Sequence, residues 1–304
     1  MTDIIIIGAG TAGLTAAIYA QRAGLSCLVL DKGSYGGQVA ITNEIENYPA
    51  FVKITGPELA QNIYKQAISQ GAEIRFEEVV RVELKGNMKK VNTSLSEYQA
   101  PAVILANGAK RRRLGVPGEE ELAGAGVSYC ATCDGMFFKG KTVAVCGGGN
   151  TALEDALFLS NLCEKVFLIH RRDKFTAEAP LINAVKSTKN IHVLFSKKVT
   201  AIEGDKKVSS VILSDVSGET KEKCPVAGVF IAIGYEPDNH LFAGQVSLDD
   251  HGYIIASEDC RTNLPGVFAA GDSRTKELRQ IITAAADGAI AAWHAANEIN
   301  IARQ

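Results

Sequence analysis

The chain has 304 residues, 46% of them hydrophobic, and a formal net charge of −2. This length suits two domains, and the small net charge gives no reason to expect a nucleic acid or a membrane surface as partner. Residues 4–21 are uncharged, which raises the alternatives of a membrane helix or a secretory signal. Three glycines inside the run, and Asp3 rather than a basic segment before it, argue against both. We therefore expect a cytoplasmic protein.

The chain begins with a dinucleotide-binding pattern. Ile4–Ile7 predicts a strand, the glycine-rich turn at 8–13 follows, and Leu14–Ala23 predicts a helix. The next predicted strand, Ser26–Leu30, leads to Asp31. Glycines allow the tight turn and bring a pyrophosphate close to the helix N-terminus. An acid at the end of the second strand binds a ribose 2′-hydroxyl and repels a 2′-phosphate.

The same pattern occurs a second time with the opposite charge. Its parts are the strand Thr142–Cys146, the turn at 147–152, the helix Ala152–Leu162 and the strand Lys165–Ile169. At the place equivalent to Asp31, 23 residues after the first glycine, this unit has His170, followed by Arg171 and Arg172. Guanidinium groups suit a 2′-phosphate. We therefore expect FAD in the first unit and NADPH in the second; a solvated basic corner is the alternative.

The order of these patterns predicts that one domain is inserted in another. Residues 1–113 and 241–304 are expected to form the FAD-binding domain, and residues 114–240 the NADPH-binding domain. The tail returns to the first domain with the strand at 266–272 and the long helix Ile281–Asn300. Glu83–Glu97 is expected to be an exposed β-hairpin. The fold class is thus α/β, with two Rossmann-like nucleotide-binding domains.

Two cysteines, Cys130 and Cys133, lie just before the second glycine-rich turn. Thiols at this spacing can form a disulfide that two electrons open. A zinc site would need a second ligand pair at matching spacing, and we expect no metal. The other five cysteines lie in or beside apolar segments and are expected to be buried thiols in a reducing compartment.

Three stretches together support a family resemblance. They are VSYCATCDG at 127–135, GGGNTA at 147–152 and HRRDKF at 170–175. The chain resembles the bacterial low-molecular-weight thioredoxin reductases over nearly its whole length. The resemblance implies two three-layer domains, transfer of electrons from NADPH through FAD to Cys130–Cys133, and thioredoxin as the final acceptor. It also implies a homodimer, and a rotation of one domain against the other between half-reactions.

Residue roles follow from the patterns and from the resemblance. Cys133 is expected next to the flavin, and Asp134 is expected to exchange a proton with the dithiol. The residues expected to bind FAD are Gly8, Gly10, Thr11, Ala12, Gly13, Asp31, Gln38, Asn47, Gly108, Gly271, Asp272, Arg279, Gln280 and Ile281. Those expected to bind NADPH are Gly147, Gly149, Asn150, Thr151, Ala152, His170, Arg171 and Arg172.

Two positions depart from the family. Thr176 stands where the family usually has an arginine, which removes one guanidinium from the expected phosphate site, and Asn107 replaces a threonine at a strand end. Three alternatives remain open at this point. One is a ferredoxin-dependent flavin thioredoxin reductase, and another is a dithiol oxidase of the same fold. The third is a redox sensor without enzymatic activity.

Overall fold

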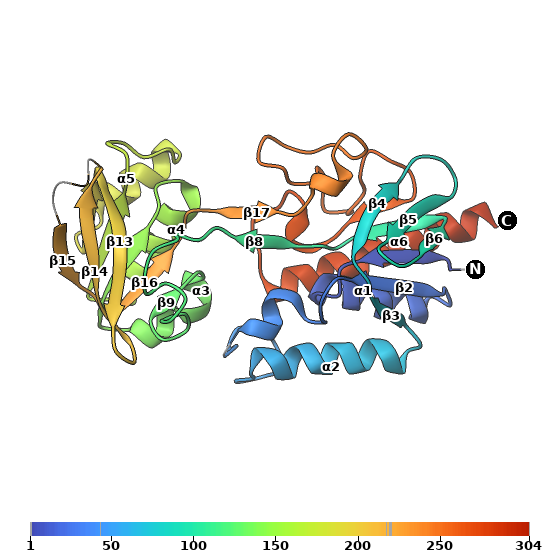
Figure 1. Cartoon of the computed structure of the whole chain (residues 1–304), viewed down its shortest axis with the longest axis horizontal. Coiled ribbons are helices and arrows are strands. Elements are labelled where there is room, and N and C mark those ends of the chain that lie inside the picture. The colour runs from blue at the N-terminus through green and yellow to red at the C-terminus, as the bar shows by residue number, and fades with distance from the viewer. Residues whose placement is uncertain (1, 43, 217, 219–220, 304) are drawn as a thin grey trace. The chain divides into compact units, whose positions relative to one another are not determined.

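The computed structural model describes residues 2–42, 44–216, 218 and 221–303 (Figure 1). The chain forms two compact units. Unit 1 joins the segment that ends at Lys110 to the segment that begins at Glu236, and unit 2 is Arg111–Tyr235. The boundaries predicted from the sequence lie three residues after the first of these crossings and five residues after the second. The predicted domain ends at residues 1 and 304 lie outside the described residues. Strands β8 (Ala109–Arg111) and β17 (Tyr235–Pro237) carry the two crossings and pair with each other.

Unit 1 contains a five-stranded parallel sheet. Its strands are, in spatial order, β18 (Val267–Ala269), β7 (Ala102–Leu105), β1 (Ile4–Ile7), β2 (Cys27–Asp31) and β3 (Glu73–Phe76). All four residues of β1 are buried, as expected for a central parallel strand with both faces covered. The run of apolar residues at 4–7 is therefore explained by burial in a sheet.

Two layers cover the two faces of this sheet. Ile4 and Ile6 pack in an apolar cluster with helices α1 (Thr11–Arg22), α2 (Gly56–Ser69) and α6 (Ile281–Ala302). Ile5 and Ile7 point the other way, as alternation along a strand requires, and pack against an antiparallel meander. The meander consists of β4 (Val79–Glu83), β5 (Lys89–Thr93) and β6 (Glu97–Ala100). The antiparallel β structure expected at 83–97 is present, but its predicted exposure was wrong, because Leu84 and Val91 are buried in the core.

Unit 2 repeats the same three layers. Its parallel sheet has the order β12 (Ile191–Phe195), β11 (Lys165–His170), β10 (Thr142–Cys146), β16 (Gly228–Ile231) and β9 (Val127–Ser128). One face packs against helices α3 (Ala131–Asp134), α4 (Asn150–Ser160) and α5 (Ala179–Ser187). The other packs against the meander β13 (Lys197–Gly204), β14 (Val208–Asp215) and β15 (Lys221–Pro225). The α/β prediction, with a second three-layer unit inserted in the first, is confirmed.

Short 3-10 helices lie in the connections and carry several predicted site residues. They are η1 (Gly37–Ile41), η2 (Gly135–Phe138), η3 (His240–Phe242) and η4 (Gly271–Ser273). The uncharged run at 4–21 is divided between β1, a turn and α1, so it does not form one long helix. Within the described residues, no helix has both the length and the apolar character needed to span a bilayer.

Candidate functional site

The two cysteines of the CxxC motif form a disulfide in unit 2. Cys130 and Cys133 have Cα atoms 5.3 Å apart, and both residues are half-buried. Cys130 is the N-cap residue of the short helix α3, and Thr132 Oγ1 lies 3.4 Å from Cys130 Sγ. The CxxC spacing thus places one turn of helix between the sulfurs. Two electrons would convert this disulfide into a dithiol.

Asp134 is held beside the disulfide by Ser128, the last residue of β9. Ser128 Oγ donates to Asp134 Oδ2 at 2.6 Å and accepts from the Cys130 backbone N–H at 3.1 Å. Burial raises the pKa of Asp134, while the Ser128 hydrogen bond and the charge of Arg111 oppose that shift. A carboxyl group whose pKa moves toward neutrality can exchange protons with a dithiol. The sequence analysis did not find this role of Ser128, because the motif by itself does not show where the hydroxyl points.

A second carboxylate shapes the segment before the disulfide. Glu119 is 1% exposed and accepts hydrogen bonds from Tyr129 Oη at 2.7 Å and from Gly115 N at 2.7 Å. Burial and the Glu119 contact raise the pKa of Tyr129 to about 12. The Arg111 guanidinium lies 5.5 Å from the centre of the Tyr129 ring. These contacts fix residue 129, and thereby the chain that leads to Cys130.

The second glycine-rich turn ends at the N-terminus of α4. A Cβ on Gly147, whose φ is +154°, would lie 2.3 Å from the Ala232 carbonyl oxygen, so only glycine fits this turn. Gly149 is the N-cap residue, and no side chain in the described part of unit 2 caps α4. The first-turn N–H groups of this 11-residue helix are therefore directed toward any anion bound at the turn. Ala152 is fully buried beneath the turn.

The neighbouring residues at this turn have distinct positions. The side chain of Asn150 exchanges hydrogen bonds with Glu178, donating to Oε1 at 3.0 Å and accepting from the backbone N–H at 2.9 Å. Thr151 is exposed on the first turn of α4. Asn150 thus ties α4 to the segment before α5, and Thr151 is the one of the two whose side chain faces solvent.

The basic cluster after β11 divides into one buried residue and two exposed ones. His170 is 8% exposed, its Nε2 lies 3.1 Å from the Lys174 carbonyl oxygen, and burial lowers its pKa. A Cβ on Gly148 would lie 2.2 Å from His170 Nδ1, so the imidazole packs directly on the glycine turn. Arg171 and Arg172 are exposed. The geometry thus leaves the two guanidinium groups available for a phosphate, while His170 supports the turn.

Thr176 is also part of the turn. Its N–H and its Oγ1 both donate to the Gly148 carbonyl oxygen, at 2.8 and 3.2 Å. The residue that replaces the family arginine therefore ties its own segment to the glycine-rich turn. It offers no positive charge there.

The first glycine-rich turn has the same geometry in unit 1. A Cβ on Gly13 would lie 1.9 Å from the Gly8 carbonyl oxygen, whereas a Cβ on Gly10 would have no described atom within 4 Å. Gly10 precedes the 12-residue helix α1, which no described side chain caps. Thr11 and Ala12, at the start of α1, are buried. The turn is closely packed on one side and open at Gly10.

Asp31 ends β2 beside this turn. Its Oδ2 accepts from Ala9 N at 2.8 Å and its Oδ1 accepts from Gly33 N at 3.0 Å. The carboxylate therefore holds the turn, and each oxygen keeps a second lone pair for a ribose hydroxyl. The ribose role of Asp31 stays a prediction, and the sequence did not predict its hydrogen bonds to the turn.

Asn107 and Gly108 follow β7. Asn107 Nδ2 donates to the Asp238 carbonyl oxygen at 2.9 Å and to Asn239 Oδ1 at 3.0 Å. The amide therefore connects the residues before the first crossing to those after the second. A threonine, with one shorter hydroxyl arm, could not make both contacts. Gly108 has a φ of +69° and no described atom near its missing Cβ.

The remaining predicted flavin residues come from three other segments of unit 1. Asn47 Nδ2 donates to Gln280 Oε1 at 3.1 Å, which joins two of them directly. Gln280 is also the N-cap residue of α6 and forms a capping box with Thr283, and Ile281 begins that helix. Gln38 Nε2 donates to the Ala109 carbonyl oxygen at 3.1 Å. The fold thus brings residues 47 and 280 together, although 233 positions separate them.

Several buried polar atoms in unit 1 fit a bound flavin nucleotide. Thr11 Oγ1 and Arg279 Nε are buried and have no hydrogen-bond partner among the described residues. The Arg279 guanidinium lies 4.2 Å from the centre of the Tyr253 ring. Buried polar atoms are normally paired, so the unsatisfied Thr11 hydroxyl next to Gly10 and the unsatisfied Arg279 Nε elsewhere in unit 1 both favour a bound ligand. Asp272, in η4, follows Gly271 directly.

The described residues contain no group of three or more His, Cys, Asp or Glu side chains that could hold a metal ion. Cysteines 27, 146, 163, 224 and 260 are buried and outside the disulfide. Burial raises the pKa of Cys146 to about 12, so this thiol stays protonated at neutral pH. These five thiols are therefore inert compared with the CxxC pair.

Comparisons with known proteins identify the family of the chain. The pyridine nucleotide-disulphide oxidoreductase family matches residues 2–288. The thioredoxin reductase of Mycolicibacterium smegmatis is 48% identical over 291 residues, which cover 95% of this chain and 94% of that protein. The thioredoxin reductase of Treponema pallidum is 45% identical over 300 residues, with 98% and 97% covered. The crystal structure of thioredoxin reductase from Streptococcus pyogenes is 40% identical, covers 99% of both chains and superposes with a TM-score of 0.93.

Proposed function

The chain belongs to the pyridine nucleotide-disulphide oxidoreductase family, among its thioredoxin reductases, and we propose that it uses NADPH and FAD to reduce thioredoxin through Cys130–Cys133. The family implies a flavin and a pyridine nucleotide. The observation that carries the proposal is the disulfide with Asp134 and Ser128 beside it. It gives the chain a group that accepts two electrons and a nearby group that handles protons.

The dithiol chemistry follows from these residues. A bound flavin would supply the two-electron step between the pyridine nucleotide and the Cys130–Cys133 disulfide. In the reduced pair, one sulfur attacks a sulfur of the thioredoxin disulfide as a thiolate. The second cysteine then displaces thioredoxin from the mixed disulfide. Cys130–Cys133 is oxidised again, and thioredoxin leaves with two thiols, so both electrons and both protons are accounted for.

Asp134 is proposed to accept and return the proton of this dithiol. It follows Cys133 directly in sequence, and burial holds its pKa above the usual range for an aspartate. Ser128 positions its carboxylate through the 2.6 Å hydrogen bond. A base of this kind raises the fraction of attacking thiolate at neutral pH.

Unit 1 is proposed to hold FAD. The α1 N-terminus would bind the pyrophosphate, with Gly10 leaving room for it, and Asp31 would bind the ribose. Asp272 is expected to bind the ribityl chain. The residues expected around the flavin ring are Gln38, Asn47, Arg279, Gln280 and Ile281. The unsatisfied Thr11 and Arg279 atoms support this assignment.

Unit 2 is proposed to hold NADPH. The α4 N-terminus would bind its pyrophosphate beside Gly149 and Thr151. Arg171 and Arg172 would bind the 2′-phosphate, because both are exposed and can make charge-assisted hydrogen bonds. His170 was predicted as a direct contact, and its burial under Gly148 favours a supporting role. Rotation of the domains between half-reactions, a homodimer and a cytoplasmic location remain predictions.

Stopped-flow measurement of flavin absorbance tests the proposal. NADPH should bleach the flavin, and oxidised thioredoxin should then restore its colour. Reduced ferredoxin, added in place of NADPH, should leave the flavin oxidised. Bleaching by ferredoxin alone would favour the ferredoxin-dependent alternative, and return of colour with oxygen in place of thioredoxin would favour the oxidase. A flavin that neither donor reduces would favour the redox sensor.

A further inference from the structure

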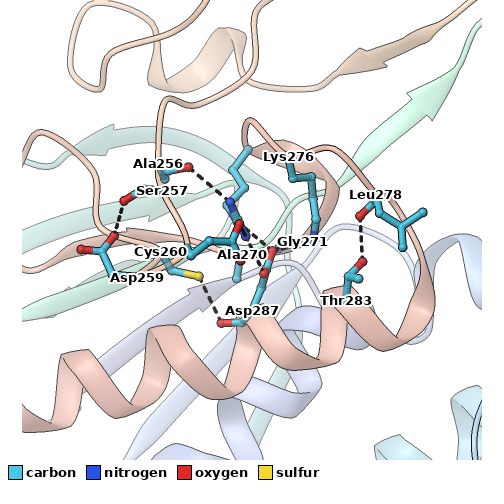
Figure 2. Close-up of polar contacts among 12 residues, drawn as sticks. Ala256, Ser257, Asp259, Cys260, Ala270, Gly271, Lys276, Leu278, Thr283 and Asp287 are labelled. Atoms are coloured by element: carbon cyan, nitrogen blue, oxygen red, sulfur yellow. Dashed lines mark hydrogen bonds and ion pairs between the residues drawn. The ribbon is translucent and has the colours of Figure 1, made fainter. Parts of the chain in front are cut away.

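A buried charge cluster lies on α6 and the segment after β18, in unit 1 (Figure 2). At its centre is Asp287, which is 3% exposed. Its Oδ2 accepts from Gly271 N at 2.9 Å, Arg274 Nε at 2.8 Å and Lys276 Nζ at 2.8 Å, and its Oδ1 accepts from Arg274 Nη2 at 2.7 Å. One carboxylate thus joins two cations and a backbone amide. The motifs discussed above assign Asp287, Arg274 and Lys276 no role.

The cluster keeps Asp287 ionised although it is buried. Burial acts to raise the pKa of Asp287, but the hydrogen bonds and charges of Arg274 and Lys276 outweigh it and lower the pKa. Arg274 is itself 1% exposed and also donates to the Ala256 and Thr275 carbonyl oxygens. Apolar residues of similar volume often replace a buried ion pair without loss of stability. A cluster of this kind therefore calls for a role beyond stability.

The backbone amide in the cluster belongs to the turn that presents Asp272. Gly271 has a φ of +79°, and a Cβ on it would lie 2.9 Å from Ala12 Cβ at the start of α1. Gly288 follows Asp287 on α6, and a Cβ there would lie 2.1 Å from the Ala12 carbonyl oxygen. The turn, α6 and the first turn of α1 are thus in direct contact. Asp287 is the polar link that fixes the turn in this packing.

We propose that Asp287, held by Arg274 and Lys276, is a positioning residue for the flavin nucleotide: its bond to the Gly271 amide sets Asp272 relative to the N-terminus of α1. The inference rests on the proposed FAD site of unit 1. Asp287 does not need to touch the nucleotide. A shift of its carboxylate changes the distance between Asp272 and the pyrophosphate-binding helix, and the nucleotide must contact both.

Two substitutions test this role on the purified full-length holoprotein. Asp287→Glu keeps the charge and both cations but moves the carboxylate by one methylene relative to Gly271. Asp287→Asn keeps the shape and removes the charge. FAD release on dilution is measured by the recovery of flavin fluorescence. We expect this release to be about tenfold faster or more in Asp287→Asn, because a charge-assisted hydrogen bond is lost. A smaller acceleration, about threefold, is expected for Asp287→Glu.

Two control variants separate positioning from stability. Asp259→Asn removes an acid of unit 1 that precedes β18 and contacts Ser257 and Arg261 but not the cluster, and it should release FAD at the wild-type rate. Ile299→Ala removes a buried side chain of α6 about three turns beyond Asp287, and should lower the melting temperature without faster release. Release rates that follow melting temperature across all four variants would overturn the inference.

FAD binding by the wild-type protein tests the proposed function separately from the role of Asp287. A wild-type protein that binds no FAD would refute the proposed function itself. A wild-type protein that binds FAD, with both Asp287 variants releasing it at the wild-type rate, would leave the function intact and refute the positioning role. If Asp287→Asn does not fold, Asp287→Glu decides, because it retains the buried charge pairs.

Discussion

The hydrogen bond between Ser128 and Asp134 should set the pH dependence of thioredoxin reduction. Ser128 is 4% exposed, and its Oγ donates to Asp134 Oδ2 at 2.6 Å, which favours the ionised carboxylate. A hydrogen bond to a charged group is worth about 1.5–3 kcal/mol, and about 1.36 kcal/mol corresponds to one pKa unit. Ser128→Ala should therefore raise the pKa of Asp134 further, by about one to two units.

The sign of the effect follows from the role of Asp134 as a base. The rate at which thioredoxin oxidises the reduced protein should fall at acid pH as Asp134 becomes protonated. In Ser128→Ala this fall should begin about one unit higher in pH or more, and in Asp134→Asn it should disappear together with most of the rate. Rapid-mixing measurements between pH 5 and pH 9, with the protein reduced beforehand, would record it. Ser160→Ala, which removes a hydroxyl bonded to Leu157 in α4, is the matched control.

Stability gives an independent check on the same bond. The folded-state pKa of Asp134 is raised, so its protonated form is favoured by folding. The stabilising contribution of the protonated carboxyl to the free energy of unfolding is complete below the pKa of the unfolded state, about 3.9. It is lost as the pH rises through the pKa of the folded state. The loss of unfolding free energy in Ser128→Ala should thus be larger at pH 7 than at pH 4. The fall in the rate of thioredoxin reduction at acid pH is the decisive measurement. The role given to Ser128 would be refuted if this fall occurred at the same pH in Ser128→Ala as in the wild type, or if it shifted equally in Ser160→Ala.

Four further outcomes are expected. Cys130→Ser and Cys133→Ser should each abolish thioredoxin turnover while NADPH still bleaches the flavin; full turnover in either variant would contradict the redox assignment. Arg171→Ala should lower the NADPH-to-NADH ratio of kcat/KM about tenfold or more, and Thr176→Arg should raise it; an unchanged ratio in Arg171→Ala would mean that the basic cluster is only a solvated corner. Gly10→Ala should fold, because nothing described lies within 4 Å of the new Cβ, yet bind FAD more weakly; equal affinity would place the pyrophosphate elsewhere. Sedimentation should show a homodimer, and a particle of about 32 kDa alone at micromolar concentration would contradict it.

Local sterics and periodicity made much of the fold predictable. Gly8 and Gly147 have φ values of +110° and +154°, which few residues other than glycine adopt, so the turns are encoded at single positions. The short strands before the two turns are apolar, apart from the half-buried Thr142 at the start of β10, because both faces of a parallel sheet are covered. The CxxC spacing likewise fixes a disulfide across one helical turn.

The domain crossings were less accessible from sequence. Leu114 and Val116 pack against the core of unit 2, and Glu119 binds the backbone between them, so the first crossing falls before Arg111. Asn239 bonds Asn107 and the Ser273 carbonyl oxygen, which holds the segment after Tyr235 in unit 1. Each boundary depends on contacts between residues far apart in the chain.

The sequence by itself determined the two glycine-rich turns, the acid after one and the arginines after the other, and the cysteine pair. These depend on backbone conformation and on charge at fixed spacing, which are local properties. The tertiary structure alone decided that Asn47 meets Gln280, that His170 is buried under Gly148, and that Asp287 holds the Gly271 turn. Such contacts form only when separate strands and helices pack together, because no local conformational preference brings their side chains within hydrogen-bonding distance.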